Sequence, residues 1–200
     1  MIETAPPPIR LAPEDEARAY HYALVSRLFF GPPDRPLAEH LAGLATGDGE
    51  TALARTRQAL RQACETADLS AVRAEYEELF IGVGKSPVTL YTSHYAASQA
   101  PDRHLLTLRQ RLCALGLARG VQVVETEDHI SGMCDAMRWL IESEQAIGEQ
   151  RRFFESFLAP AGGALCDAVA NAPSSRFYKL VAELAAVFFQ LEHEAFAMSV

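Results

Sequence analysis

The sequence predicts an all-α fold, and three observations support this prediction. Apolar residues recur at helical spacing in several segments, helix start and stop signals separate these segments, and no stretch alternates apolar and polar residues as a half-buried strand does. The chain has 200 residues, of which 49% are hydrophobic, so it has enough material to bury one core. We therefore expect a bundle of about 8–10 helices.

The first helix is expected from Pro13 to about Phe30. Proline suits a first helical position, and the acidic residues at 14–16 are favoured near the positive end of the helix dipole. Residues 1–12 include a run of prolines, which favours an extended, flexible tail over a packed element. The bundle should therefore begin at residue 13.

Two short helices should follow, near residues 36–45 and 49–66, with the turn-prone TGDGE between them. The next helix, from Asp68, has the clearest apolar stripe, and the glycines at 82 and 84 end it. This stripe consists of Leu69, Val72, Tyr76, Leu79 and Phe80. Residues 81–98 then form a long loop, and a loop of this length in a compact protein is more often functional than idle.

Further helices complete the bundle. Leucines at helical spacing mark one helix over residues 105–115. Residues 150–172 should give one helix interrupted at Pro160, or two short helices. A long last helix over about 177–191 begins after a serine cap at 174 or 175.

These elements fit one helical domain over residues 13–196. The long loop divides it into an N-terminal part, about 13–100, and a C-terminal part, about 101–196. Because helical segments joined by a long hinge can exchange between copies, a homodimer formed by helix exchange is a further expectation.

The charge balance favours a cationic partner. With 18 Lys and Arg against 26 Asp and Glu, the net charge is −8, which disfavours nucleic acid and anionic membrane surfaces as partners. No apolar run approaches the ~18 residues of a membrane span, and the first residues lack the basic and apolar pattern of an export signal. We expect a cytoplasmic protein with no stable membrane insertion. Its cysteines are expected as buried, reduced thiols, at Cys64, Cys113, Cys134 and Cys166.

Two patterns that suggest nucleotide or metal chemistry do not meet the requirements of those sites. GVGKS, residues 82–86, resembles the end of a phosphate-binding loop, but Leu79 stands where that motif requires glycine, and Pro87 follows it in place of a helix. The chain also lacks His-Glu-x-x-His and the Glu-x-x-His pairs of di-iron bundles. We therefore expect no cofactor and no metal site.

The segment VVETEDHISGMCDAMRWL, residues 123–140, is the most informative. Its apolar residues fall on one helical stripe, which predicts Thr126 as the N-cap and places Glu127 and Asp128 in the first turn. A helical wheel then places a second set on the opposite face: Asp128, Gly132, Asp135, Trp139 and Glu142. These acids serve either to offset the helix dipole or to bind a ligand.

Carboxylates and an indole along one side of a helix suit a guanidinium, through paired hydrogen bonds and cation–π stacking. We therefore hypothesise an arginine-binding groove that uses Asp128, Asp135 and Trp139. Packing of Trp139 against another helix is the alternative. Glu125 and Glu127 are assigned to helix-dipole and surface roles.

Four segments carry a family resemblance: YEELFIG (76–82), LYTSHY (90–95), EDHISGMCDAM (127–137) and FYKLVAELAAVFFQLE (177–192). Together they resemble the TorD/DmsD/NarJ family of cytoplasmic, all-helical chaperones. The resemblance implies a protein that is not an enzyme. It would bind the twin-arginine signal peptide on the catalytic subunit of a molybdenum-containing oxidoreductase, and delay export until the molybdopterin cofactor is inserted.

The resemblance also implies the positions that bind the signal peptide, namely Tyr76, Leu79, Phe80, Gly82, Tyr91, Ser93, Tyr95, Asp128 and His129. For the first three, helical spacing equally predicts core packing, and for the three loop residues the alternative is anchoring of the loop. His129 would make peptide binding depend on pH near its ordinary pKa of ~6.5. The alternative function is a small hydrolytic or metal-dependent enzyme that uses Asp128 and His129.

Overall fold

The computed structural model describes residues 11–44, 50–82, 86–96, 101–118, 120 and 124–198. In these residues the chain forms α-helices, two π-helical segments and no strand ladder, so the all-α class is confirmed. Two predictions fall largely outside the described residues: the tail before residue 11, and the turn TGDGE. Residues 83–85 of the GVGKS segment lie outside them as well.

The helices follow the predicted order. They are α1 Pro13–Phe30, α2 Arg35–Ala42, α3 Ala52–Glu65, α4 Leu69–Tyr76, α5 Thr92–Ala96, α6 Pro101–Ala114, α7 Ile130–Glu142, α8 Ile147–Phe153, α9 Ala159–Ala170 and α10 Phe177–Met198, with π-helical segments η1 Glu77–Ile81 and η2 Phe154–Leu158. Helix α5 is a single short helix inside the segment predicted as a loop. Segment η2 joins α8 to α9, so the chain stays helical from Ile147 to Ala170 and the predicted interruption at Pro160 is wrong. Pro160 is accommodated because it lies in the first turn of α9, directly after the π-helical segment.

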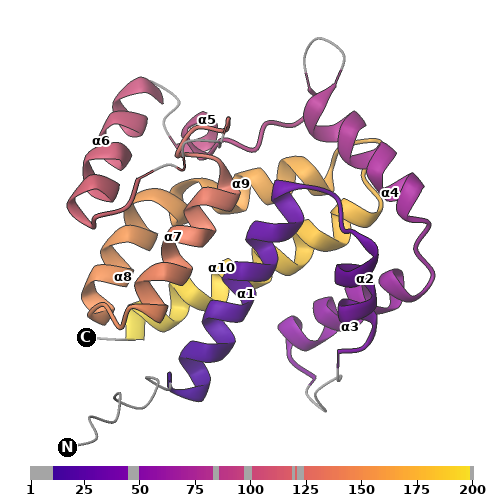
Figure 1. Ribbon diagram of the computed structural model, residues 1–200, viewed down its shortest axis with the longest axis horizontal. Coiled ribbons are helices and arrows are strands. Elements are labelled where there is room, and N and C mark those ends of the chain that lie inside the picture. The colour runs from indigo at the N-terminus through magenta and orange to yellow at the C-terminus, as the bar shows by residue number, and fades with distance from the viewer. Residues whose placement is uncertain are drawn as a thin grey trace, which may run out of the picture.

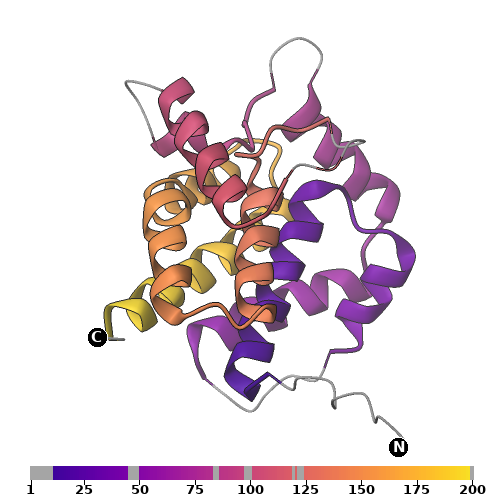
Figure 2. The same ribbon diagram turned by 60° about the vertical axis from the view of Figure 1, so that its left-hand side comes forward.

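Helices α1, α7 and α10 form the centre of the molecule (Figure 1). Helix α1 packs along α7 in both views, and α10 runs from α3 and α4 at its start to the far end of the bundle (Figures 1 and 2). Helices of the N-terminal part therefore contact helices of the C-terminal part along the length of the core. The division at about residue 100, and an exchange of helices between copies, stay predictions.

A buried charge joins α1 to α10. Glu192 is 3% exposed, and its carboxylate accepts hydrogen bonds from Arg18 at 2.8 and 2.9 Å and from the hydroxyl of Tyr22 at 2.9 Å. A carboxylate removed from water is tolerated only when it is paired and hydrogen-bonded in this way. These contacts therefore fix the two central helices relative to each other.

Glu75 of α4 caps the start of α10 from another helix. Its carboxylate accepts hydrogen bonds from the backbone N–H groups of Arg176, Phe177 and Tyr178 at 2.8, 3.1 and 2.8 Å. The predicted serine cap is wrong, because this carboxylate takes the free N–H groups, and the hydroxyl of Ser175 is buried without a partner. A cap contributed by a distant segment cannot be predicted from local sequence.

The cysteine prediction holds in part. Among the described residues the four cysteines are free, and Cys64, Cys134 and Cys166 are buried. Burial raises the pKa of Cys64 to about 11 and that of Cys166 to about 12, which keeps these thiols protonated at neutral pH. Cys113 is exposed, so that prediction is wrong. It lies on the outward side of α6, which contributes Leu108 to the core.

Candidate functional site

A single antiparallel bridge ties the loop before α5 to the residues before α7. It pairs Tyr91 with His129. The N–H of Thr92 donates to the carbonyl of Asp128 at 2.8 Å, and the N–H of Ile130 donates to the carbonyl of Leu90 in the loop, also at 2.8 Å. The backbone before α7 is therefore held extended, although no sheet forms around it in the described residues.

This bridge moves the start of α7 downstream of the predicted position. Helix α7 begins at Ile130, and its N-cap is His129, whose Nδ1 accepts a hydrogen bond from the N–H of Ser131 at 3.3 Å. The prediction of Thr126 as the cap is wrong, and Glu127 lies in a turn before the helix. The physical reason is that bridge hydrogen bonds occupy backbone groups at 128–130 which a longer helix would need.

Asp128 is enclosed within this junction. Its side chain accepts hydrogen bonds from the hydroxyls of Ser93 and Thr126, the latter at 2.5 Å, and the residue is 2% exposed. The helical wheel that placed Asp128 on the outer face with Trp139 is wrong, because position 128 is not helical. Asp128 thus holds the loop against the start of α7.

Tyr91 and Tyr95 anchor the same loop. The hydroxyl of Tyr91 donates to the carboxylate of Glu125, and its ring meets that of His129 edge-on at 5.5 Å. Burial, and then the hydrogen bond to Glu125 and the charge of that carboxylate, raise the pKa of Tyr91 to about 12, so its hydroxyl stays protonated. The hydroxyl of Tyr95 donates to the carbonyl of Thr89 at 2.9 Å.

His129 is buried beside two acids. Burial lowers its pKa below the ordinary value, and the charges of Glu125 and Asp128 partly offset this. The hydrogen bond from Ser131 requires an unprotonated Nδ1 and therefore agrees with a neutral ring at pH 7. Any titration of His129 is thus shifted below the ~6.5 expected from its ordinary pKa.

The other residues assigned by resemblance lie at the last turn of α1. Leu79 is fully buried, and Gly82 ends η1 with a φ of 56°, in the left-handed region where glycine is favoured. The hydroxyl of Tyr76 donates to the carbonyls of Phe29 and Phe30 at 3.2 and 3.0 Å. Tyr76 thereby holds the last turn of α1.

Phe80 completes an aromatic cluster at this place. Its ring lies edge-on to those of Tyr76 and Tyr178, at 5.0 and 5.1 Å, and to that of Phe29 at 6.3 Å. Core packing therefore describes Tyr76, Leu79 and Phe80. The cluster positions Phe30, which is 58% exposed and points away from this core.

A pocket of about 370 Å³ opens beside the first turns of α7, and we call it the α7 pocket. Its apolar wall comes from α1, α6 and the residues after α6, and its polar wall from residues 125–139. The lining residues are Phe30, Leu112, Leu117, Ala118, Gly120, Glu125, Thr126, Glu127, His129, Ser131, Gly132, Asp135, Ala136, Arg138 and Trp139. The predicted residues His129, Asp135 and Trp139 therefore meet at one site.

The described residues give the α7 pocket a predominantly negative lining. Among them are the carboxylates of Glu125, Glu127 and Asp135 and one guanidinium, that of Arg138. Glu127 pairs with Arg109 at 2.9 Å, whereas the ion pair between Asp135 and Arg138 is loose, at 3.8 Å. A cation that enters the pocket would therefore meet the Asp135 carboxylate, whose charge this loose ion pair offsets only in part.

Trp139 has two roles in this wall. It is half-buried, packs against the core, and also lines the pocket beside Asp135. The two alternatives for Trp139 are therefore compatible. An indole face next to a carboxylate can receive a guanidinium by stacking and by charge.

Sequence reasoning missed part of this site. The sequence pattern predicts dipole and surface roles for Glu125 and Glu127, yet both line the pocket, and it marks Phe30 only as the end of a helix. The acidic density of 125–128 was the available signal for the first two. No local signal marks Phe30, because only the packing of α1 against α7 brings it to the site.

Two kinds of feature are absent from the described residues. In the described ranges no group of three or more His, Cys, Asp or Glu side chains is arranged to hold a metal ion. No helix in this part of the chain is both long and apolar enough to cross a membrane.

Comparison with known proteins finds similar proteins that span most of the chain. A solved structure from Archaeoglobus fulgidus, named as a candidate redox enzyme maturation protein, superposes with a TM-score of 0.51 at 21% identity, covering 92% of this chain and 96% of the other. An uncharacterised protein of Haemophilus influenzae is 26% identical over 179 residues, which are 84% of this chain and 91% of that protein. The family model described as nitrate reductase delta subunit matches residues 46–167, more than half of the chain. The protein therefore belongs to the nitrate reductase delta subunit family, the NarJ- and TorD-type chaperones of redox enzyme maturation, which are not catalysts.

Proposed function

We propose that this maturation chaperone binds the twin-arginine signal peptide of the catalytic subunit of a molybdenum-containing oxidoreductase. It holds that peptide in the α7 pocket while the cofactor is inserted, and releases it for export. The observation that carries the proposal is a pocket whose lining includes Trp139 together with the carboxylates of Glu125, Glu127 and Asp135. Carboxylates and an indole together suit guanidinium groups better than they suit a neutral or anionic ligand.

The apolar part of the same pocket suits the rest of such a peptide. Phe30, Leu112 and Leu117 form its opposite wall, so a segment with arginines followed by apolar residues would contact both walls at once. Asp128 and Tyr76 contribute indirectly in this proposal, because Asp128 holds the loop and Tyr76 holds the last turn of α1.

Binding would proceed by exchange of cations. Arg109 and Arg138 already pair with two of the acids, so arginines of the peptide would replace them. Replacement of one ion pair by another gains little from charge alone. Recognition therefore also requires the indole of Trp139 and the apolar wall.

The test is the affinity of the purified protein for a synthetic peptide that carries Arg-Arg before an apolar segment, measured by isothermal titration calorimetry. Asp135→Asn and Trp139→Ala should each raise the Kd about tenfold, since each removes a contact of about 1–2 kcal/mol. A peptide with Lys-Lys should bind more weakly than Arg-Arg, because lysine cannot form the paired, planar hydrogen bonds of a guanidinium.

Glu142→Gln is the matched control, because Glu142 is an exposed acid on the same helix that does not line the pocket. It should leave the Kd unchanged. If Asp135→Asn and Trp139→Ala also left the Kd unchanged, with their folds intact by circular dichroism, the α7 pocket would not be the peptide site.

A further inference from the structure

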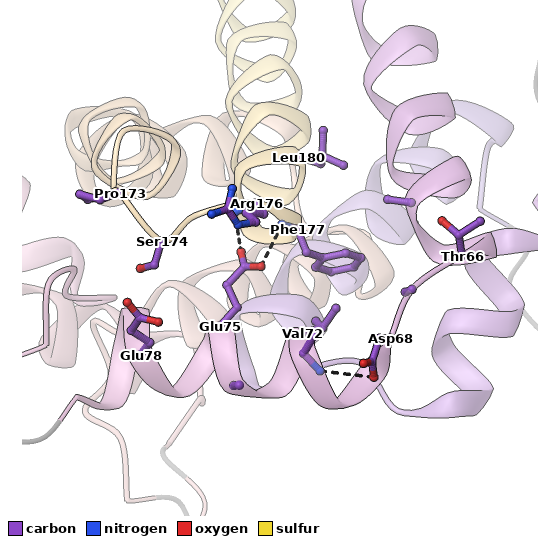
Figure 3. Close-up of a pocket in the computed structure, with 14 residues that line it drawn as sticks. Thr66, Asp68, Val72, Glu75, Glu78, Pro173, Ser174, Arg176, Phe177 and Leu180 are labelled. Atoms are coloured by element: carbon purple, nitrogen blue, oxygen red, sulfur yellow. Dashed lines mark hydrogen bonds between the residues drawn. The ribbon is translucent and has the colours of Figure 1, made fainter.

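A second and larger cavity lies between α4 and the start of α10, and we call it the α4–α10 groove (Figure 3). Its volume is about 810 Å³. Its lining residues are Ala63, Thr66, Ala67, Asp68, Ala71, Val72, Ala74, Glu75, Glu78, Pro173, Ser174, Arg176, Phe177 and Leu180. None of them lines the α7 pocket, so this groove is a separate feature.

The middle of the groove is apolar and made largely of small side chains. Alanines of α3 and α4 line it. Figure 3 shows Phe177 and Leu180 of α10 across from Val72 of α4. Small side chains let another backbone approach closely, and apolar channels between helices are the usual seat of an amphipathic helix. The shape therefore fits a helix that lies along α4.

Acids stand at both ends of this apolar stretch. Asp68 lies at the start of α4 and Glu78 beyond its end (Figure 3). Hydrogen bonds from Ser70 and Ala71 lower the pKa of Asp68, so it stays ionised. At a rise of about 1.5 Å per residue, the two acids are roughly 15 Å apart along the helix axis.

The start of α10 does not offset this negative charge. A helix N-terminus normally favours an anion, but here Glu75 already accepts the N–H groups of Arg176, Phe177 and Tyr178. With Glu75 occupied in this way, the described lining residues leave the carboxylates of Asp68 and Glu78 at the two ends of the groove and one guanidinium, that of Arg176. This balance favours a cationic ligand and opposes a phosphate or an acidic peptide.

We propose that the α4–α10 groove binds a basic amphipathic helix of a partner protein, with apolar residues against Val72, Phe177 and Leu180. Two Lys or Arg residues of this partner helix lie about ten positions apart, so that one reaches Asp68 and the other reaches Glu78. This site is independent of the signal-peptide pocket. The chaperone can therefore contact a partner at two places.

The probe is a fluorescein-labelled designed peptide of about 16 residues, with leucines at helical spacing between two lysines about ten residues apart. Its affinity for the full-length protein is measured by fluorescence anisotropy. Glu78→Lys should raise the Kd about five- to tenfold, and Ala71→Trp, which fills the groove from an exposed helical position, about tenfold. Peptides with glutamates for lysines, or with both lysines at one end, should bind more weakly.

Glu77→Lys is the matched control, because it makes the same charge change one residue away, at an exposed position off the groove. It should leave the Kd unchanged, as should Asp135→Asn in the α7 pocket. The proposal is overturned if Glu77→Lys and Glu78→Lys weaken binding equally, or if Asp135→Asn abolishes binding while Ala71→Trp does not. Equal binding of the lysine and glutamate peptides would also overturn it.

Discussion

Asp128 and Asp135 are two aspartates on either side of the start of α7, and the fold gives them opposite environments. Asp128 is 2% exposed, and the hydroxyls of Ser93 and Thr126 occupy its carboxylate. The side chain of Asp135 is 55% exposed, and Arg138 pairs with it only loosely, at 3.8 Å. An acidic cluster at a helix start can thus divide into a structural carboxylate and one that remains open to a ligand.

The largest expected effect is on stability at the buried position. Asp128→Ala should lower the free energy of unfolding by about 3 kcal/mol or more, because two hydrogen bonds to a buried carboxylate are lost and two hydroxyls lose their acceptor. Asp135→Ala should change it by no more than about 0.5 kcal/mol. Urea unfolding of both variants measures the difference.

Equal losses of stability in the two variants would contradict this difference between the aspartates.

The affinity of the same two variants for the Arg-Arg peptide is a second test. Asp135→Ala should lower the peptide affinity of the folded protein because it removes a contact with the peptide. Asp128→Ala should lower that affinity only to the extent that the loop detaches from α7. Limited proteolysis of residues 86–96 measures this detachment.

The next effect concerns Tyr91, which joins the loop to an acid of the pocket. Tyr91→Phe should lower the free energy of unfolding by about 1.5 kcal/mol, since its hydroxyl donates to the carboxylate of Glu125. The same change leaves Glu125 one donor fewer, so affinity for the Arg-Arg peptide should rise while stability falls. A fall in affinity of the same variant would instead make Tyr91 a direct peptide contact.

The pH dependence of stability tests the role of the buried His129 at the start of α7. Because the folded pKa of His129 lies below its ordinary value, the unfolded chain takes up the proton first. Its contribution to stability is therefore complete above about pH 6.5 and is lost as the pH falls through the folded pKa. His129→Asn keeps a capping acceptor, worth about 1 kcal/mol, but does not titrate.

Unfolding of wild type and His129→Asn between about pH 5 and 8 measures this contribution. The wild type should lose more stability below about pH 6.5 than the variant. Burial also lowers the pKa values of His21 and His104, but both proteins contain these residues, so their effect cancels in the difference. Parallel pH profiles would show that His129 is not the titrating group.

The smallest expected effect is at the exposed aspartate, Asp135. Arg138→Gln removes the cation beside Asp135, and an exposed pair of this kind contributes about 0.2–1 kcal/mol. Affinity for the Arg-Arg peptide should therefore increase about two- to fivefold, because the peptide no longer displaces a resident cation. A decrease would mean that Arg138 contacts the peptide, and Arg151→Gln on α8, outside the pocket, controls for the change of net charge.

Much of the secondary structure was predictable because its causes are local. The proline and acids at the start of α1, the apolar stripe of α4 and Gly82 at the end of η1 all act within a few residues. Family motifs also mark the segment around His129. The start of α7 was not predictable in the same way, since the bridge from Tyr91 displaces it.

The sequence by itself determined an all-helical acidic chain, its order of helices and the membership of Asp135 and Trp139 in an acidic, aromatic face. Only the tertiary structure decided that Asp128 is enclosed, that Glu125 and Glu127 line the pocket, and that Phe30 faces them from α1. The physical reason is distance along the chain. Helical periodicity fixes which residues share a face, but burial and hydrogen bonding depend on which distant segment covers that face.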